Sequence, residues 1–341
     1  MMDEIEYFDK DTEFDDRNIK EVASVDGIIY EFNYDGTAAI SAYNNEMIGK
    51  NLKIPERVQD SDGNLYRVTK IDDFAFIQFE ELEKADIPDS VLKIGEGAFI
   101  NCENLRTVRL PKCITELKEG VFSGCTNLQN IVIPENVTSI GDNAFNDCEK
   151  LTDLVLPEKL QRIGERAFAN CENLKSIFVP QFVESIGENA FGCCDNPINV
   201  VVDNANTKYK VDGHCLIELD TNKVLQGDKN SVIPDYVKEI ENGAFAYCKG
   251  LENIRLPQGL TKIGEDAFAL CFDLKEVFIP SSVVEIGENA FESCSAKLIC
   301  DFESRPDSWT EDIGVDGKYF VWNLKKSGIF QKLKDKLSKK K

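Results

Sequence analysis

The stretch from Leu128 to Phe145, LQNIVIPENVTSIGDNAF, decides the fold because its pattern recurs every 23 residues along most of the chain. Phenylalanine occupies one position of the repeat, at 76, 99, 122, 145, 168, 191, 245, 268 and 291. Proline keeps the same register at 88, 111, 134, 157, 180, 234, 257 and 280, and a cysteine follows the phenylalanine by three residues from 102 to 294. A fixed period of this length predicts a solenoid of stacked supersecondary units.

Each position of the unit has a physical role. Ile131 and Ile133 have the spacing of a short strand with one buried face, and Pro134 ends it because proline cannot donate to a continuing ladder. Gly141 permits a turn that a side chain would obstruct, and Phe145 plugs the interior from a short helical or 3-10 stretch. Stacking predicts a β-rich α/β solenoid of about nine turns, with one continuous parallel sheet and the helical or 3-10 turns on its opposite side.

The unit resembles the leucine-rich repeats of the BspA type. The pattern I-P-x-x-V-x-x-I-G-x-x-A-F-x-x-C recurs with few departures over residues 87–294, and a departure such as Lys118 in place of glycine fits a quasi-regular stack. The resemblance implies a right-handed leucine-rich repeat superhelix with β-hairpin caps. It also implies protein binding or adhesion without catalysis, an expectation that rests on analogy between folds.

The flanks and one gap in the repeat define the expected organisation. Asp-Gly turns between apolar runs predict a hairpin cap, and the interval between Pro180 and Pro234 holds one unit plus an extra hairpin. The expected segments are an acidic disordered arm (1–20), an N-terminal β-hairpin cap (21–69), leucine-rich repeats (70–196), a partial repeat with the inserted hairpin (197–231), further repeats (232–299), a C-terminal cap (300–324) and a basic tail (325–341).

The charge pattern limits the partners. The 341 residues carry a formal net charge of −22, whereas the tail from Lys325 onward holds eight lysines and one acid. An acidic body repels phosphates, so nucleic acid is not an expected partner. Four apolar tail residues lie near one helical face among the lysines, which predicts weak contact with anionic membranes: Ile329, Phe330, Leu333 and Leu337. The alternatives are a solubilising tail or one that folds onto the body.

Neither a transmembrane span nor an export signal is expected. No stretch approaches the roughly 18 to 20 apolar residues that a transmembrane helix needs. The start, from Met1 to Glu6, is acidic where a secretory signal would be basic and then apolar. The protein is therefore expected in the cytoplasm, and the family resemblance gives the cell surface or secretion as the alternative.

Residues that carry catalysis are scarce. His214 is the only histidine, which excludes a histidine dyad and an HExxH motif, and we interpret it as a turn residue of the inserted hairpin. Eight of the twelve cysteines share one repeat position and are expected to be buried free thiols rather than metal ligands. Four cysteines outside this position could include a reactive one: Cys113, Cys193, Cys215 and Cys300. No enzymatic activity, metal or cofactor is expected.

The outer face of the strands carries the clearest functional signal. If Ile131 and Ile133 face the core, the residue between them faces solvent, and the same register selects Val132, Val155, Phe178 and Val201. Arg109 precedes this row, and Arg255 and Phe278 follow it beyond the insertion. An exposed apolar row often marks an interaction site. The alternative is that valine and phenylalanine simply suit strands, or that another segment covers them.

Two functions follow from these patterns. The first is a non-catalytic module that binds a protein, or a glycan, on the sheet face, with the oligomeric state left open. The second is an intracellular or membrane-peripheral scaffold or regulatory protein anchored by its basic tail.

Overall fold

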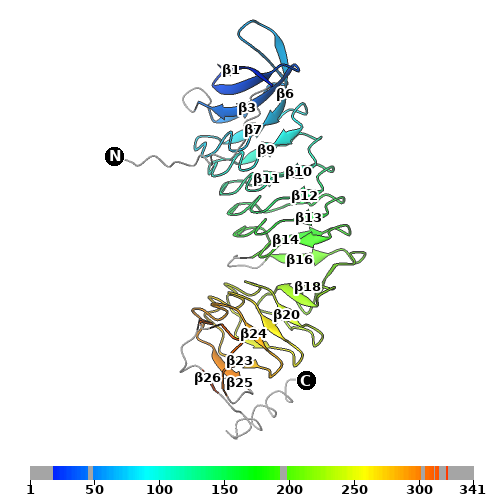
Figure 1. The fold of residues 1–341 in the computed structure, drawn as a ribbon, viewed down its shortest axis with the longest axis vertical. Helices are drawn as coiled ribbons and strands as arrows, with labels where there is room; N and C mark the ends of the chain where they lie inside the picture. Colours follow the sequence, from blue (N-terminus) through cyan, green and yellow to red (C-terminus); the bar gives the residue numbers. More distant parts are fainter. Residues whose placement is uncertain are drawn as a thin grey trace, which may run out of the picture.

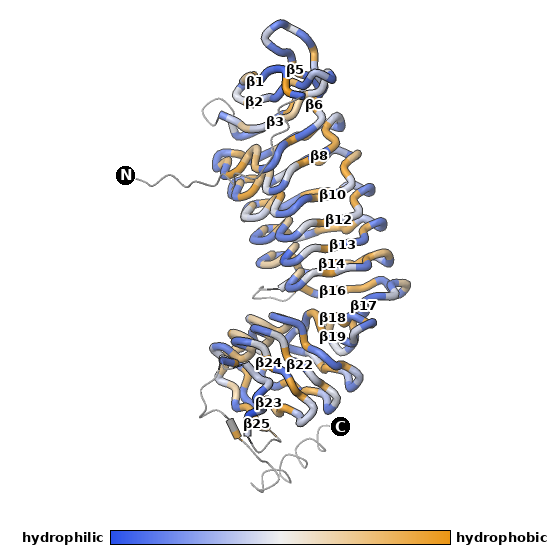
Figure 2. The backbone as a smooth tube through the Cα atoms, in the orientation of Figure 1, coloured by the Kyte–Doolittle hydropathy of each residue, from blue (hydrophilic) through white to orange (hydrophobic). Residues whose placement is uncertain are grey.

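The computed structural model describes residues 18–44, 49–192, 198–300, 304–310, 312–314 and 320–321, and these contain short strands and turns but no helix. The strands form a stack of successive turns along the length of the molecule (Figure 1). Hydrophobic and hydrophilic residues alternate along each turn (Figure 2), because every turn sends one set of side chains inward and the other to solvent. The protein is therefore a β-solenoid, as the 23-residue period predicted, and the handedness of the coil stays a prediction.

A small sheet closes the N-terminal end of the solenoid. Strands β1 (Ile19–Val25), β2 (Ile28–Asn33) and β3 (Thr37–Tyr43) form an antiparallel meander. Strand β6 (Leu65–Ile71) pairs in parallel with β3 and antiparallel with β5 (Arg57–Gln59). An ion pair fastens the first strand to this sheet, because Lys20 Nζ donates to the buried Asp60 carboxylate at 2.7 Å.

One set of parallel ladders joins the strands that precede the repeat prolines. It comprises β4 (Asn51–Lys53), β7 (Lys84–Asp86), β9 (Thr107–Arg109) and β11 (Asn130–Ile131), then the separate pair β14 (Ser176–Val179) and β16 (Asn199–Val202). Beyond the insertion it resumes with β21 (Asn253–Arg255), β23 (Glu276–Ile279), β25 (Lys297–Cys300) and β26 (Phe320–Val321). Paired repeat residues are 23 positions apart, as Asp86 and Arg109 are.

A second set of parallel ladders, which the sequence analysis did not predict, runs through the Ile-Gly step of the repeat. It comprises β8 (Lys93–Ile94), β10 (Glu116–Leu117), β12 (Ser139–Ile140), β13 (Arg162–Ile163) and β15 (Ser185–Ile186), then β20 (Glu239–Ile240), β22 (Lys262–Ile263) and β24 (Glu285–Ile286). The prediction of one continuous sheet was therefore wrong. Turns of equal length align their backbones on both sides, so both sides pair.

The segment around each repeat phenylalanine is not helical, contrary to the prediction. Two positions of the unit, represented by Asn143 (φ 53°) and Asp147 (φ 59°), lie in the left-handed region, which interrupts a right-handed helix. The amides of this segment bond either to the next turn or within their own turn. Phe145 N–H donates to the Ala167 carbonyl of the next turn at 2.9 Å, and Cys148 N–H donates to the Phe145 carbonyl of its own turn at 3.2 Å. Bonds between turns replace the expected helical bonds.

The repeat phenylalanines form two buried columns. Phe145, Phe168 and Phe268 are fully buried, which confirms the predicted register. Neighbouring rings stack face to face, and the centroids of Phe145 and Phe168 lie 5.5 Å apart with 6° between the ring planes. Because each inner ring contacts the rings of both adjacent turns, one phenylalanine supports three turns of the solenoid.

Gly141 allows two turns to approach each other closely. A Cβ atom at this position would lie 2.6 Å from the backbone nitrogen of Glu119 in the preceding turn. The side chain is therefore excluded by contact between turns. This refines the expectation that glycine is needed for the turn itself.

An inserted hairpin divides the solenoid into two parts, which we call the first stack (residues 70–202) and the second stack (residues 230–300). Strands β17 (Tyr209–Asp212) and β18 (Cys215–Glu218) pair antiparallel, and β19 (Lys223–Gln226) joins β18 to β20 of the second stack. The buried apolar residues also separate into two clusters at this point. The direction of the stack changes at the insertion (Figure 1).

The phenylalanine column predicts the stability of one variant directly. Phe145→Ala removes a fully buried ring with stacking partners on both faces, so we expect the free energy of unfolding to fall by about 3 to 5 kcal/mol. Chemical denaturation monitored by circular dichroism measures this change. Phe272→Ala is the control, because that ring is 64% exposed and its removal should change stability by about 0.5 kcal/mol or less. Equal effects of the two substitutions would contradict the assigned register.

Candidate protein-binding surface

Four apolar side chains, which we call the outer row, project from the strand face of the first stack. Val132 and Val155 are 82% and 83% exposed, and Phe178 and Val201 are 50% and 44% exposed. The exposure predicted from the register is therefore confirmed, whereas the role of the row in binding stays a prediction.

The ladder beneath the outer row is interrupted. Residues 151–156, which carry Val155, form no strand, and β11 and β14 lie on either side of them without pairing to each other. The inward and outward alternation nevertheless continues, because Leu154 and Leu156 are buried on either side of Val155. The row thus depends on the stacked core more than on an unbroken sheet.

The two predicted arginines already have carboxylate partners within the chain. Arg109 Nε donates to Asp86 on the neighbouring strand, and its Nη1 lies 3.5 Å from an Asp89 oxygen. The hydrogen bond to Asp86 raises the pKa of Arg109. Arg255 Nη2 donates to Asp235 at 3.0 Å, and this pair is equivalent to Arg109 and Asp89. These pairs are exposed and therefore weak, so a partner's acidic group could bind only by displacing the internal carboxylate.

In the second stack the position equivalent to the outer row is occupied by Val232, Arg255 and Phe278, each two residues before a repeat proline. Arg255 is exposed, whereas Phe278 is only partly exposed and lies between Arg255 and Ile299 of the adjacent strands. The inserted hairpin separates both residues from Val201 along the solenoid (Figure 1). The role of Arg255 and Phe278 in binding therefore stays a prediction.

Sequence reasoning missed several exposed apolar side chains beside the outer row. Phe182 is 55% exposed two residues after Pro180, a position where only one other repeat, with Tyr236 after Pro234, carries an aromatic residue, so a comparison of the units could have found it. Val211, Val232 and Tyr236 are exposed around the inserted hairpin. Val232 and Tyr236 lie two residues before and after the repeat proline Pro234, so the register could have found them, whereas Val211 has no repeat register and only the folded hairpin reveals it.

A groove lies between β16 and the inserted hairpin. It has a volume of about 480 Å³ and is lined by residues 199–204, Asn206, residues 209–211 and His214. His214 has a φ of 60°, in agreement with its interpretation as a turn residue, and its Nδ1 lies 3.4 Å from an Asp228 oxygen. The exposed Val201 of the outer row forms part of the groove wall, so the row and the groove are continuous.

Polar contacts fasten the hairpin beside this groove. Tyr236 donates its hydroxyl proton to the Asp212 carboxylate at 2.8 Å, and Lys210 donates to the same carboxylate at 3.0 Å. These two bonds lower the pKa of Asp212. The Lys210 ammonium also lies 4.6 Å from the centre of the Tyr236 ring, within cation–π range. The hairpin is thus anchored to the second stack.

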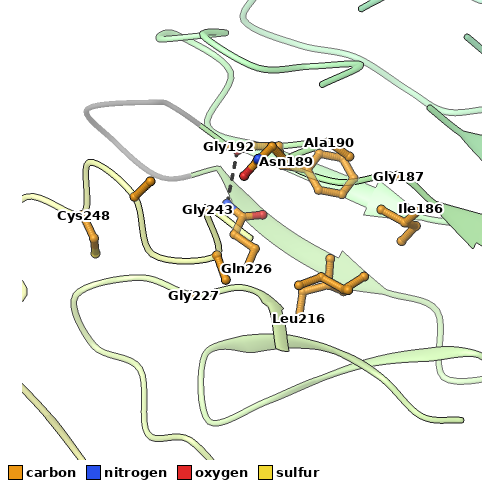
Figure 3. A pocket seen from close by; sticks show the side chains of 14 residues that line it. Ile186, Gly187, Asn189, Ala190, Gly192, Leu216, Gln226, Gly227, Gly243 and Cys248 are labelled. Carbon is orange, nitrogen blue, oxygen red and sulfur yellow. Dashed lines mark hydrogen bonds between the residues drawn. The ribbon is translucent and has the colours of Figure 1, made fainter. Parts of the chain in front are cut away.

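The junction between the two stacks contains a small cavity (Figure 3). Its volume of about 20 Å³ is enough for roughly one water molecule and too small for an organic ligand. Gln226 crosses it and donates from Nε2 to the Phe191 carbonyl at 3.3 Å, while its buried Oε1 has no hydrogen-bond partner among the described residues. We interpret the cavity as a packing feature of the junction.

The column cysteines that the structure describes are buried, and most of them make the same kind of hydrogen bond, whereas Cys194 lies outside the described residues. The thiol of Cys102 lies 3.1 Å from the Phe76 carbonyl, and that of Cys125 lies 3.2 Å from the Phe99 carbonyl, so each donates to the phenylalanine of the preceding turn. Burial raises the pKa of Cys102 to about 12. The cysteines that the structure describes are all free, and the column position suits a small apolar group with a weak donor.

The cysteines outside the column differ in exposure. Cys113 is exposed, whereas burial raises the pKa of Cys215 to about 11 and that of Cys300 to about 12. Cys193 lies outside the described residues, as do the membrane-tail candidates Ile329, Phe330, Leu333 and Leu337. Within the described ranges, no three metal-binding side chains cluster, and no helix has the length and apolar character needed to cross a membrane.

Comparison with known proteins places this geometry among repeat proteins. A family model described as the BspA type leucine rich repeat region matches six copies over residues 68–203 and 228–309. No curated protein matches the sequence.

Several solved structures share the fold. A leucine rich cell surface protein from Faecalibacterium prausnitzii is 24% identical, with a TM-score of 0.66 over 92% of this chain and 98% of its own. The pneumococcal vaccine antigen PcpA is 20% identical, with a TM-score of 0.74 over 90% of this chain and 88% of its own. A leucine-rich repeat protein from Eubacterium ventriosum is 23% identical, with a TM-score of 0.61 over 83% and 72%.

Alkylation of the cysteine thiols tests which parts of the repeat are exposed and which are buried. In the native protein at pH 8, iodoacetamide should alkylate the exposed Cys113 within minutes, while Cys102 and Cys148 should react only after unfolding. Burial blocks reagent access to both column thiols, and their raised pKa leaves almost no reactive thiolate at that pH. Mass spectrometry of tryptic peptides measures each site. Rapid labelling of Cys148 in the folded chain would contradict the buried column.

Proposed function

The chain belongs to the family of BspA-type leucine-rich repeat proteins, and on this premise we propose that it is a non-catalytic binding module that receives a protein partner on the outer row. The observation that carries the proposal is the alignment of two almost fully exposed valines with Phe178 and Val201 on one face. Burial of one such side chain contributes about 1.5 to 3 kcal/mol when complete. An aligned set therefore offers enough apolar surface to centre an interface.

The chemistry of the outer row favours a protein over the other partner classes. The side chains of the row are apolar and offer no hydrogen-bonding group to the hydroxyls of a glycan, which would lose their water on binding. The net charge of −22 disfavours nucleic acid. An apolar patch of a neutral or basic protein matches both the surface and the charge.

Two alternative locations are compatible with this binding function. One relative of the same fold is described as a cell surface protein, which supports a role in adhesion. The basic tail supports instead a scaffold that contacts anionic membranes through the tail. The outer row serves as the binding surface in either location.

The proposal is tested by placing charge on the row. We expect the double substitution Val155→Asp and Phe178→Asp to abolish capture of the native partner, because carboxylates at the centre of an apolar interface lose water without gaining partners. The partner is defined by photo-crosslinking from a benzoylphenylalanine at position 132 in the source organism, and its affinity is then measured with purified proteins. Thermal stability should stay within about 1 kcal/mol, as for exposed sites.

A matched control adds the same charge elsewhere. Val284→Asp with Phe272→Asp changes one valine and one phenylalanine that are 58% and 64% exposed in the second stack, away from the outer row. This variant should bind the partner with unchanged affinity. If the row variant binds as tightly as the control variant, the outer row is not the binding surface.

A further inference from the structure

Strand β16 ends the first stack with an open edge. It pairs with β14 on one side, and no strand in the described part of the chain pairs with its other side. An interior strand such as β9 differs, because it pairs with both β7 and β11. The edge is open where the groove beside the inserted hairpin lies.

The backbone of β16 directs hydrogen-bonding groups into this groove. Asn199 N–H donates to the Lys175 carbonyl and Asp203 N–H to the Val179 carbonyl, each at 3.0 Å, so alternate residues face β14. Bonding groups alternate sides along a strand, and Val200 and Val202 therefore present their N–H and C=O groups to the open side. No backbone bond joins the amide of either valine to another described residue.

The insertion explains why the edge stays open. By the repeat period, the chain around Val232 should pair with β16. Val232 N–H donates instead to the Gly213 carbonyl at the tip of the hairpin, at 2.8 Å. The hairpin thus bonds to the start of the second stack, and β16 has no partner strand on the side away from β14.

The open edge lacks the features that usually protect a strand from pairing. The sequence of β16, Asn-Val-Val-Val, contains no charge, no proline and no bulge. Exposed Val201 and Val211 border the groove, and Asp203 follows the strand at its end. An extended segment could therefore gain backbone bonds from the edge, apolar contacts from the valines and an ionic contact from the carboxylate.

We propose that this groove binds an extended peptide segment of the partner by strand addition to β16, with an apolar residue beside Val201 and a basic residue toward Asp203. The inference rests on the proposed function and gives the partner a backbone anchor at the end of the outer row. A second copy of the chain is disfavoured as the occupant, because each copy carries a net charge of −22.

The test begins with a defined probe. A displayed library of random linear dodecapeptides is selected on the full-length chain, and enriched peptides are synthesised for fluorescence polarisation. We expect alternating β-branched residues with at least one lysine or arginine. N-methylation of alternate peptide amides should abolish binding in one register and spare it in the other, because only one set of amides faces β16. Failure to enrich a peptide, or equal tolerance of both registers, would overturn the proposal.

Two substitutions in the chain isolate the backbone donor. Val202→Pro removes the N–H that faces the groove and leaves the bonds to β14 in place, so we expect at least tenfold weaker peptide binding. Val202→Ala trims the same side chain but keeps the N–H, and it should bind within about threefold of the parent chain. If Val202→Pro melts early, Val201→Lys supplies the second variant: it adds charge on an exposed site and should repel the basic peptide. Peptide binding that is unchanged in Val202→Pro, or in Val201→Lys where it is used, overturns the proposal.

The outcomes separate this inference from the proposed function. A chain with Val132→Asp and Val155→Asp should lose the native partner but bind the selected peptide as before. If this chain keeps the partner while Val202→Pro loses the peptide, the outer row is not the binding surface, and the groove is still a peptide-binding site. Sedimentation that shows a dimer dissolved by Val202→Pro would replace the peptide with a second copy and overturn the assignment.

Discussion

Equal turn length is the constraint on which the rest of the structure depends. Because the repeat turns contain 23 residues each, backbone groups of one turn lie beside those of the next turn and bond to them on several sides of the solenoid. The same alignment stacks Phe145 on Phe122 and Phe168, and brings the thiol of Cys148 to the Phe122 carbonyl. Stability of such a stack is the sum of similar contacts between neighbours, so individual turns tolerate departures such as Lys118.

The binding features follow from the same constraint and from its single large interruption. Where the period holds, outward residues align, and Val132, Val155 and Phe178 form a row although the ladder beneath Val155 is broken. Where the insertion breaks the period, β16 loses the partner that the next turn would have supplied. The molecule therefore offers side-chain contacts along the first stack and backbone contacts at its end.

Much of this arrangement could be predicted from the sequence, because one-dimensional periodicity maps directly onto a stacked fold. The burial of Phe145 and the exposure of Val132 required only the register. The second ladder was missed because Ile140 and Gly141 were interpreted as a turn. The helix was wrongly expected because the left-handed conformation of Asn143 was not inferred, although asparagine or glycine often adopts it. The pairing of Arg109 with Asp86 followed the same 23-residue register but was overlooked.

The groove could not be predicted, since it depends on how the non-repeating segment around His214 packs against Val232. Hydrogen–deuterium exchange of the full chain tests the central claim. The claim is that backbone bonds between turns hold the solenoid together and are missing on the open side of β16. Amides that bond to a neighbouring turn, such as Gly141 and Phe145, should be strongly protected, while Val200 and Val202 exchange fastest among the strand residues of the first stack. Equal protection of both sets, or rapid exchange at Phe145, would contradict the account.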